Sequence, residues 1–277
     1  GKGVLICENE QEAADGVKEI MLDKKFGASG NHVVVEEFLT GPEVSVLSFC
    51  DGKTVKPMVS SMDHKRALDH DEGLNTGGMG TVAPNPYYTP AVAERCMQEI
   101  FLPTVAAMQA EGCPFKGCLY FGLMLTPDGP KVIEYNCRFG DPETQVVLPL
   151  LESDLLTVME ATTNGTLDKT DVKFSDGAAA CVILASGGYP LAYEKGKEIT
   201  GLTAGQLDAA DVTVYHAGTA IKDGSLVTNG GRVLGVTATA NTLPEALKKA
   251  YAATESIHFD KLHKRSDIGA RALAAMQ

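Results

Sequence analysis

The sequence predicts an α+β protein, with antiparallel sheets and helices in its first part and a smaller, mainly β domain at its end. Three observations support this fold class. Apolar segments of strand length alternate with amphipathic helical segments over most of the chain. Residues 118–126 and 131–136 have the composition of strands and are joined by Pro127-Asp128-Gly129-Pro130, a turn sequence. After about residue 170, strands and glycine-rich turns predominate.

The segments before residue 62 are predicted as one helix among several strands. Asn9 and Glu12 have the spacing of a capping box, so a helix is expected to begin after Asn9. The apolar composition of four other segments predicts strands at 4–7, 32–38, 43–49 and 54–60.

Residues 62–90 differ from the segments around them. They are rich in Asp, His, Gly, Asn and Pro and show no clear period, which predicts a long loop that is either functional or disordered. A helix is expected to begin at Thr89-Pro90, with proline at the favoured first position. Ser153 is predicted to cap a further helix.

A domain boundary is predicted at about residues 168–176, because the sequence changes there to strand-like segments joined by glycine-rich turns. The apolar run 178–185 suits a buried strand, and Thr242 is expected to open a helix. Two further strands are predicted at 212–216 and 232–240. The chain is therefore predicted to consist of three structural parts, residues 1–62, 63–170 and 171–277.

Charge and composition argue against several classes of protein. The formal net charge is −12, whereas broad binding to nucleic acid or to anionic membranes needs a basic face. No apolar run approaches the roughly 20 residues that span a bilayer. The seven cysteines are odd in number and lack Cys-x-x-Cys spacing, which indicates reduced thiols in a cytoplasmic protein. The chain opens on Gly1-Lys2-Gly3-Val4 without a signal-peptide pattern, so we expect a fragment of a longer protein.

Glu134 and Asn136 are the strongest candidates for metal ligands. They stand two positions apart on a predicted strand and therefore face the same side, about 6.6 Å apart along it. Two oxygen donors at this spacing suit Mg²⁺, which fills its remaining positions with water and phosphate oxygens. A solvated face of an edge strand explains the same pattern, and this segment alone favours that simpler interpretation.

The residues that follow shift the balance towards function. Arg138 can hold a carboxylate or phosphate through two hydrogen bonds. Asp141, Glu143 and Gln145 are suited to orienting an amine or hydroxyl. A capped helix start with an incidental salt bridge is the alternative. A cation, two acids and an amide beside a metal pair favour a functional site.

Asn75-Thr76-Gly77-Gly78-Met79-Gly80 is a candidate anion-binding loop. Its glycines allow close backbone approach to a ligand, and successive N–H groups there can form an anion nest. Asp63-His64-Lys65-Arg66 precedes it and supplies positive charge. Flexible turns have the same composition, and His64 by itself suggests a hydrogen-bonded surface residue rather than a catalyst.

Two further segments are ambiguous on spacing alone. Residues 33–43 could form a plain β-hairpin or a hinge that holds a nucleotide, with backbone groups at the adenine edge and an acid on the ribose. Gly1-Lys2-Gly3 could be a phosphate-binding loop, but it lacks the full Walker pattern.

Taken in order, these segments resemble the phosphoribosylamine–glycine ligase family of ATP-grasp enzymes, over essentially the whole chain. The combination of Asn75–Gly80 with 136–145 is its most specific part, although 136–145 also occurs in loosened form in other ATP-grasp ligases. The C-terminal runs 187–190, 216–219 and 230–234 resemble the family's last domain. The resemblance implies the ATP-grasp fold, with 1–62 in the nucleotide-covering subdomain, 63–170 as the catalytic and metal-binding subdomain and 171–277 as the C-terminal ligase domain.

The resemblance also implies a reaction. Members join glycine to 5-phosphoribosylamine through glycyl phosphate, giving glycinamide ribonucleotide, ADP and phosphate in de novo purine biosynthesis. ATP and Mg²⁺ or Mn²⁺ would be the cofactors. Glu134 and Asn136 would hold the metal, and Arg138 and Asp141 would be catalytic. The nucleotide would contact Lys2, Glu36, Glu37, Phe38, Leu39 and Glu43, and the substrates would contact Lys65, Arg66, Gly77, Gly78, Met79 and Gly80 together with Arg138 and Asp141.

Two departures from the family pattern qualify this hypothesis. An N-terminal nucleotide-fold-like domain and a phosphate-binding lysine are expected upstream of Gly1, so the fragment alone is expected to be inactive. Residues 120–124 carry no acid, although many ATP-grasp enzymes have a metal ligand on that strand, so a thinner metal shell or one completed by water is expected. Beyond its small-molecule substrates, the protein is expected to be a monomer or homodimer. The alternatives are another ATP-grasp carboxylate–amine ligase or a carboxylase of purine synthesis, or a nucleotide-binding module without catalysis.

Overall fold

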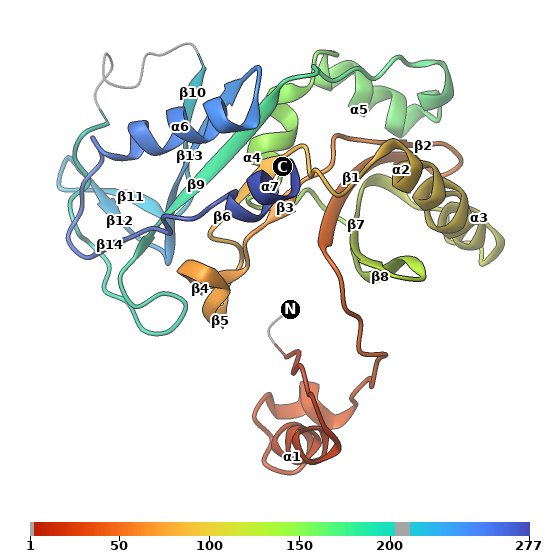
Figure 1. Ribbon diagram of the computed structural model, residues 1–277, viewed down its shortest axis with the longest axis horizontal. Helices are drawn as coiled ribbons and strands as arrows, with labels where there is room; N and C mark the ends of the chain where they lie inside the picture. The colour runs from red at the N-terminus through yellow and green to blue at the C-terminus, as the bar shows by residue number, and fades with distance from the viewer. Residues whose placement is uncertain (1–2, 203–210) are drawn as a thin grey trace. The chain divides into compact units, whose positions relative to one another are not determined.

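The computed structural model describes residues 3–202 and 211–277, and the chain divides into two compact units, Gly1–Thr40 and Gly41–Gln277 (Figure 1). The first unit contains α1 (Glu10–Met21) and the 3-10 helix η1 (Gly27–Asn31). The Asn9 side chain accepts a hydrogen bond from the Glu12 backbone N–H at 3.0 Å, and a Glu12 carboxylate oxygen accepts from the Glu8 N–H at 2.9 Å. The predicted cap of this helix is therefore confirmed.

The strands predicted at 4–7 and 32–38 are wrong. Both segments are described, and neither has strand structure. Val34 and Val35 are each 83% exposed, so the apolar composition of this segment does not report burial within the unit. Composition alone suggested strands here, but a strand also requires a neighbouring strand with which its backbone can pair.

The first sheet of the larger unit has the strand order β2 (Val55–Pro57), β1 (Glu43–Asp51), β7 (Lys116–Thr126), β8 (Gly129–Asn136), all antiparallel. The strand predicted at 43–49 and the predicted pair across residues 127–130 are confirmed, whereas of the segment predicted at 54–60 only Val55–Pro57 is strand. Between β2 and β7 come α2 (Pro90–Cys96), the π-helical turn η3 (Met97–Phe101) and α3 (Leu102–Ala110). Thr89 accepts a hydrogen bond from the Val92 N–H at 3.3 Å and so caps α2, as predicted.

Helices cover both faces of this sheet. Alternating residues of β1 point to opposite faces. Val44 and Val46 pack with Ile100, Phe101 and other residues of α2, η3 and α3. Leu47 and Phe49 pack on the other face with Val158 of α5 (Leu155–Asn164). The N-cap of α5 is Asp154, which accepts from the Thr157 N–H at 2.7 Å, so the predicted cap Ser153 was wrong by one position.

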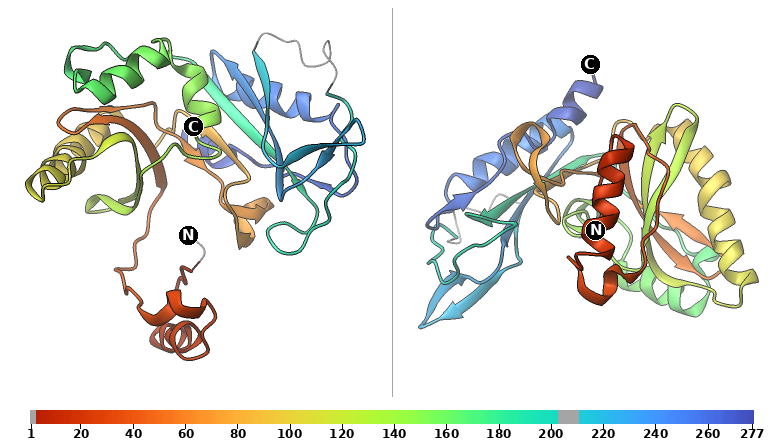
Figure 2. Two further views of the ribbon diagram at one scale, coloured as in Figure 1. Left: turned by 180° about the vertical axis from the view of Figure 1, so that it is seen from behind. Right: turned by 90° about the horizontal axis from the view of Figure 1, so that it is seen from below.

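The second sheet has the order β10 (Val212–His216), β13 (Arg232–Ala240), β9 (Ala178–Ser186), β6 (Gly80–Ala83), β3 (Met62–Asp63), and β14 (Leu262–His263) also pairs with β9. The strands predicted at 178–185, 212–216 and 232–240 are confirmed. All nine residues of β9 are buried, because helices pack on both of its faces. Ala180 and Val182 meet α6 (Leu243–Thr254), whereas Cys181 and Ile183 meet α4 (Thr144–Val147) (Figures 1 and 2).

The predicted long loop at 62–90 is wrong in part, because 13 of its 29 residues form short paired strands. Besides β3 and β6 it contains the hairpin of β4 (Arg66–Leu68) and β5 (Glu72–Asn75) around η2 (Asp69–Asp71). The strand β6 pairs with β9, about a hundred positions later in the chain, so no local period reveals it. Strands from residues 62–83 thus share a sheet with strands from the C-terminal part, and the three-part division of the chain remains a prediction.

The remaining elements complete the C-terminal part of the larger unit. They are η4 (Leu148–Leu150), η5 (Leu167–Lys169), the hairpin of β11 (Thr219–Lys222) and β12 (Ser225–Thr228), and α7 (Ala270–Ala275). None of the described helices is both long and apolar enough to cross a membrane. All seven cysteines lie in described segments, and each is a free thiol.

Candidate active site

A row of polar side chains crosses one face of the first sheet. In antiparallel pairs, residues directly opposite each other point to the same face. The register pairs Ser45 with Gly122 and Gly122 with Glu134, and it pairs Asn136 with Tyr120. The polar groups of β1, β7 and β8 therefore gather on the face that also carries Leu47 and Phe49.

Glu134 and Asn136 meet on this face. The Asn136 amide nitrogen lies 3.2 Å from a Glu134 carboxylate oxygen, and both residues are half-buried. Neighbouring ligands of an octahedral Mg²⁺ lie about 3 Å apart, and a half-turn of the amide presents its oxygen at this position. The pair therefore fits one divalent cation. Among the described residues no group of three or more His, Cys, Asp or Glu is suited to a metal ion, so this pair would share the ion with water or phosphate oxygens.

Gly122 is the residue of β7 that lies opposite Glu134 in the register. A Cβ atom on Gly122 would lie 3.1 Å from the Glu134 Cγ and 3.3 Å from the Tyr120 ring. A side chain at position 122 would therefore require the Glu134 and Tyr120 side chains to shift by a few tenths of an ångström.

Lys65 brings positive charge to this face. Its ammonium group lies 2.6 Å from a Glu43 carboxylate oxygen. Burial alone would lower the pKa of Lys65, but the charges of Glu43, and then of Asp63 and Glu134, outweigh burial and raise it. The lysine is therefore held charged, within electrostatic reach of the carboxylate that we assign to the metal.

Two buried carboxyl groups lie beside Lys65. Burial and the neighbouring Glu143 raise the pKa of Asp63 well above its ordinary value, and burial likewise raises the pKa of Glu143. The Ser45 hydroxyl lies 2.8 Å from the Tyr120 hydroxyl and donates to Glu143 at 3.5 Å. The Asp63 Oδ1 atom is buried and accepts no hydrogen bond from the described part of the chain. Sequence reasoning assigned no individual role to Asp63.

The predicted glycine loop covers Asp63 closely. Gly78 has φ +112°, and a Cβ atom there would lie 2.5 Å from both Asp63 Oδ1 and Pro142 Cδ. The loop is tied to the residues before it, because Thr76 donates through its backbone N–H and its hydroxyl to the Lys65 carbonyl, at 2.7 and 2.8 Å. The backbone at Gly78 can lie this close to Asp63 and Pro142 only because glycine has no side chain.

Arg232 joins the glycine loop to the segment after β8. One guanidinium nitrogen donates to the Gly77 carbonyl at 2.7 Å and to the Asp141 carbonyl at 2.8 Å. The other terminal nitrogen lies 3.2 Å from the Asp141 carboxylate. The Tyr189 hydroxyl accepts from the Gly77 N–H at 3.0 Å. Sequence reasoning used Arg232 and Tyr189 only as parts of C-terminal runs and missed both as site residues.

The two predicted catalytic residues differ in their surroundings. Asp141 is about half exposed and is oriented by Arg232 and by the Gln145 amide, which donates to it at 2.9 Å. Arg138 is exposed, and it donates to the Phe139 carbonyl at 2.9 Å. The guanidinium has five donors, so most of its donor capacity remains for an anionic ligand.

His64 is not the surface residue that its sequence context suggested. Its side chain is buried, Nδ1 lies 3.2 Å from the Gly80 carbonyl, and Nε2 accepts from the Gly269 N–H at 3.0 Å. These partners require a neutral ring with its proton on Nδ1. Burial, with the charges of Arg271 and Arg265, lowers the pKa of His64 to about 4. His64 is therefore a structural support of the glycine loop.

The residues predicted to hold the nucleotide do not all lie in one compact unit. Glu36, Glu37, Phe38 and Leu39 belong to the first unit, and Glu43 belongs to the second. Lys2 lies outside the described residues. The substrate-side residues Lys65, Arg66 and Gly77–Gly80 all lie in the second unit, with Lys65 charged, Arg66 exposed and Met79 and Gly80 buried.

Two family models match the chain. The model of the phosphoribosylglycinamide synthetase ATP-grasp (A) domain matches residues 1–144, and that of the phosphoribosylglycinamide synthetase C domain matches residues 179–271. The chain belongs to the phosphoribosylglycinamide synthetase family. The resemblance found in the motifs is thereby confirmed.

Curated relatives of this synthetase family match the chain along its whole length. The phosphoribosylamine–glycine ligase of Vibrio vulnificus is 48% identical over 278 residues, which cover 100% of this chain and 64% of that protein. The trifunctional purine biosynthetic protein adenosine-3 of Gallus gallus is 50% identical over 275 residues, which cover 99% of this chain and 27% of that protein. The chain thus spans less than two thirds of the length of these relatives.

Solved structures agree with the family assignment. The crystal structure of phosphoribosylamine–glycine ligase from Thermotoga maritima matches with a TM-score of 0.84 at 38% identity, covering 97% of this chain and 66% of that one. The biotin carboxylase domain of the Hydrogenobacter thermophilus 2-oxoglutarate carboxylase matches with a TM-score of 0.67 at 13% identity, covering 99% of this chain and 58% of that chain. The predicted α+β class is confirmed as the ATP-grasp fold with a following C-terminal domain.

Proposed function

We propose that the protein containing this chain uses ATP to join glycine to 5-phosphoribosylamine, giving glycinamide ribonucleotide, ADP and phosphate. Family membership supports this reaction, and so do the names of the relatives that match the whole chain. A carboxylate is a poor electrophile, so phosphoryl transfer to glycine must precede attack by the amine. Both steps move negative charge between oxygens, and catalysis then rests mainly on positioning and on electrostatic stabilisation.

One observation carries the proposal: Arg232 bonds to Gly77 and to both the carbonyl and the carboxylate of Asp141. The two motifs whose combination is specific to this family are thereby joined in one site. We assign Arg138 and Asp141 to the reacting groups and the Gly77–Gly80 loop, with Lys65 and Arg66, to substrate binding. The charge of Lys65 and the free donors of Arg138 suit the carboxylate and phosphate groups of these substrates.

Glu134 and Asn136 are the residues that would hold Mg²⁺ or Mn²⁺ in this scheme. The bound ion would neutralise charge on the ATP phosphates. We assign Glu43 of β1 to the nucleotide side of the site, together with Glu36, Glu37, Phe38 and Leu39 of the first unit and Lys2. The seven free thiols are consistent with our proposal that the protein works in the reducing cytoplasm, as a monomer or homodimer.

The test is release of phosphate from ATP by the full-length protein. We expect release only when glycine and phosphoribosylamine are both present. Glu134→Gln should reduce turnover at least about a hundredfold, the loss typical of a contact that stabilises the transition state. Glu99→Gln is the matched control, because Glu99 lies in the turn η3 and, among the residues that the structure describes, forms an ion pair with Arg95 alone. Release that is independent of glycine, or turnover unchanged in Glu134→Gln, would contradict the proposal.

A further inference from the structure

The hairpin that carries Lys65 and Arg66 has little core of its own. All four residues of β5 are exposed, and of the three residues of β4 only Ala67 is buried. The connecting turn η2 also places two non-glycine residues, His70 and Asp71, at φ +60° and +56°. Left-handed backbone at such residues persists only where surrounding contacts impose it.

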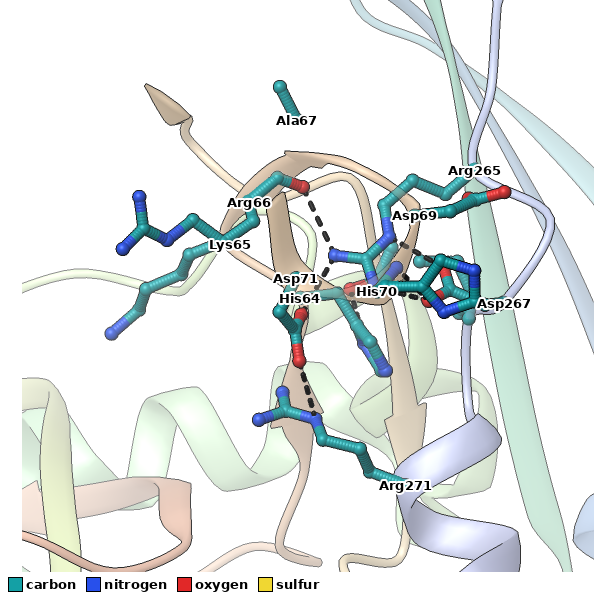
Figure 3. Close-up of polar contacts among 12 residues, drawn as sticks. His64, Lys65, Arg66, Ala67, Asp69, His70, Asp71, Arg265, Asp267 and Arg271 are labelled. Atoms are coloured by element: carbon teal, nitrogen blue, oxygen red, sulfur yellow. Dashed lines mark hydrogen bonds and ion pairs between the residues drawn. The ribbon is translucent and has the colours of Figure 1, made fainter. Parts of the chain in front are cut away.

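Those contacts come from the C-terminal segment His263–Gly269, almost 200 positions later in the chain (Figure 3). The His263 Nε2 atom lies 2.7 Å from the Ala67 carbonyl, which it bonds as a donor. The Ser266 N–H donates to Asp69 at 2.8 Å, and the Asp267 carboxylate accepts from the His70 N–H at 2.8 Å. The strained turn is therefore fixed from outside the hairpin.

Arg265 lies at the centre of this arrangement. Its side chain is 1% exposed, and it donates to both Asp267 carboxylate oxygens, at 2.7 and 2.9 Å. Its other terminal nitrogen donates to Asp71 at 3.0 Å and to the Arg66 carbonyl at 3.1 Å. Only the planar guanidinium fork can reach these acceptors together, and a lysine ammonium cannot reproduce this geometry. Burial would raise the pKa of Asp267, but bonds from Arg265 and His70 hold it well below its ordinary value.

The same segment also supports the glycine loop. The Gly269 N–H donates to His64, and His64 in turn bonds the Gly80 carbonyl through Nδ1. Residues 263–269 thus contact the hairpin at Arg66 and, through His64, support the loop at Gly80. These two contacts lie at either end of the substrate-binding segment. The metal pair on β8 has no such contact with this segment among the interactions of the described residues.

We infer that the segment His263–Gly269 positions the substrate-binding hairpin and glycine loop, with Arg265 as the central positioning residue. The identity of the substrate in this inference rests on the proposed function, whereas the positioning of the hairpin and the loop does not. Loss of the fork should let Lys65 and Arg66 shift, whereas Glu134 and Asn136 on the first sheet keep their places. A displacement of about 1 Å in positioning groups can cost about a hundredfold in rate.

The test compares Arg265→Lys with Arg271→Lys in the full-length protein. Arg271 is the matched control, because it pairs with the other oxygen of Asp71 but is half exposed. We expect Arg265→Lys to raise the KM for phosphoribosylamine at least about tenfold and to leave the KM for ATP within about twofold. Arg271→Lys should leave both constants within about twofold. A purely structural role would instead change both constants together, and this result would overturn the positioning role.

Amide hydrogen exchange of residues 64–77 provides a second readout that needs no activity. Exchange there should accelerate at least about tenfold in Arg265→Lys and remain unchanged in β1 and β7. If Arg265→Lys does not fold, Asp267→Asn removes one partner of the fork and is measured in the same way. Unchanged exchange in residues 64–77 of a folded variant would overturn the inference. If the wild type shows no glycine-dependent activity, the proposed function fails while the exchange result still decides the positioning role.

Discussion

Gly78→Ala tests how closely the glycine loop is packed over the site. The added methyl carbon would lie 2.5 Å from Asp63 Oδ1 and 2.5 Å from Pro142 Cδ. Both neighbours are enclosed, because Asp63 lies in β3 with its Oδ1 atom buried and Pro142 is buried in the segment before α4. Gly78 also has φ +112°, a conformation that residues with a side chain rarely adopt.

The expected loss of stability is the sum of two effects. Positive φ costs a residue with a Cβ about 1–2 kcal/mol. Forcing an additional methyl group into a packed region costs about 1–3 kcal/mol. We therefore expect Gly78→Ala to lower the free energy of unfolding by about 2–5 kcal/mol. Gly112→Ala is the matched control, since Gly112 has φ +74° but no atom within 4 Å of an added Cβ, and it should lose only about 1–2 kcal/mol.

Urea unfolding of the wild type and the two variants, followed by circular dichroism, measures both losses. A positive φ is common to both variants, so the loss of Gly78→Ala beyond that of Gly112→Ala reports the packing effect together with the additional backbone cost of φ +112° over +74°. A Gly78→Ala loss equal to that of Gly112→Ala would refute the reasoning, because the loop would then have room for a side chain. Restored stability in a double variant that also removes the Asp63 carboxylate would identify Asp63 as the neighbour that is crowded.

Three further predictions follow from buried or partly buried groups. The fold favours neutral His64 with a pKa of about 4, so its contribution is complete above the unfolded value near 6.5 and is lost as the pH falls towards 4. The free energy of unfolding of the wild type should therefore fall by up to about 3 kcal/mol over this range, and that of His64→Gln should fall less. An equal fall in the two proteins would contradict this prediction. Burial raises the pKa of Cys181 to about 12, so a thiol reagent should label exposed Cys113 in the folded protein and Cys181 only after unfolding; mass spectrometry of labelled peptides decides. Arg232→Lys should lower the free energy of unfolding in urea by about 1–3 kcal/mol. Arg95→Lys, which affects an exposed ion pair, should lower it by under about 1 kcal/mol. Similar losses in the two variants would contradict the role of Arg232 as a bridge between Gly77 and Asp141.

Local patterns predicted the elements whose cause is local. The cap formed by Asn9, the helix start at Thr89 and the turn between β7 and β8 each depend on residues a few positions apart. Glu134 and Asn136 share a face because alternation along a strand needs no distant information. These features were therefore available from the sequence, and the structure confirms them.

The predictions failed where pairing is distant. The strands at 4–7 and 32–38 were inferred from composition, but neither segment has strand structure. Conversely, residues 62–90 showed no period, yet β6 pairs with β9 and lies between β9 and β3 in the second sheet. Short strands carry too few residues to show alternation, so only the partner strand reveals them.

Arg232 was missed for a different reason, which its own sequence context could have revealed. It begins a strand whose other members are mostly apolar, and it follows Gly230 and Gly231. A Cβ on Gly231 would lie 2.2 Å from the Tyr189 ring, so these glycines allow close contact rather than flexibility. A lone arginine on a buried strand must find acceptors for its guanidinium. That requirement, applied to a strand beside a glycine loop, points to loop carbonyls as the partners.

Arg265 shows the limit of this argument. The stretch Arg265-Ser266-Asp267 has alternating charges, which in sequence is typical of a solvated surface, and so is Asp69-His70-Asp71. Taken alone, the charged side chains of each stretch would be solvated by water. They form one cluster only because the chain brings the two together across 194 positions, where the buried Arg265 side chain pairs with the partly exposed Asp71. The cost of removing these charges from water must be offset by their mutual contacts, so replacing either one should be far more harmful than its exposed appearance in the sequence suggests.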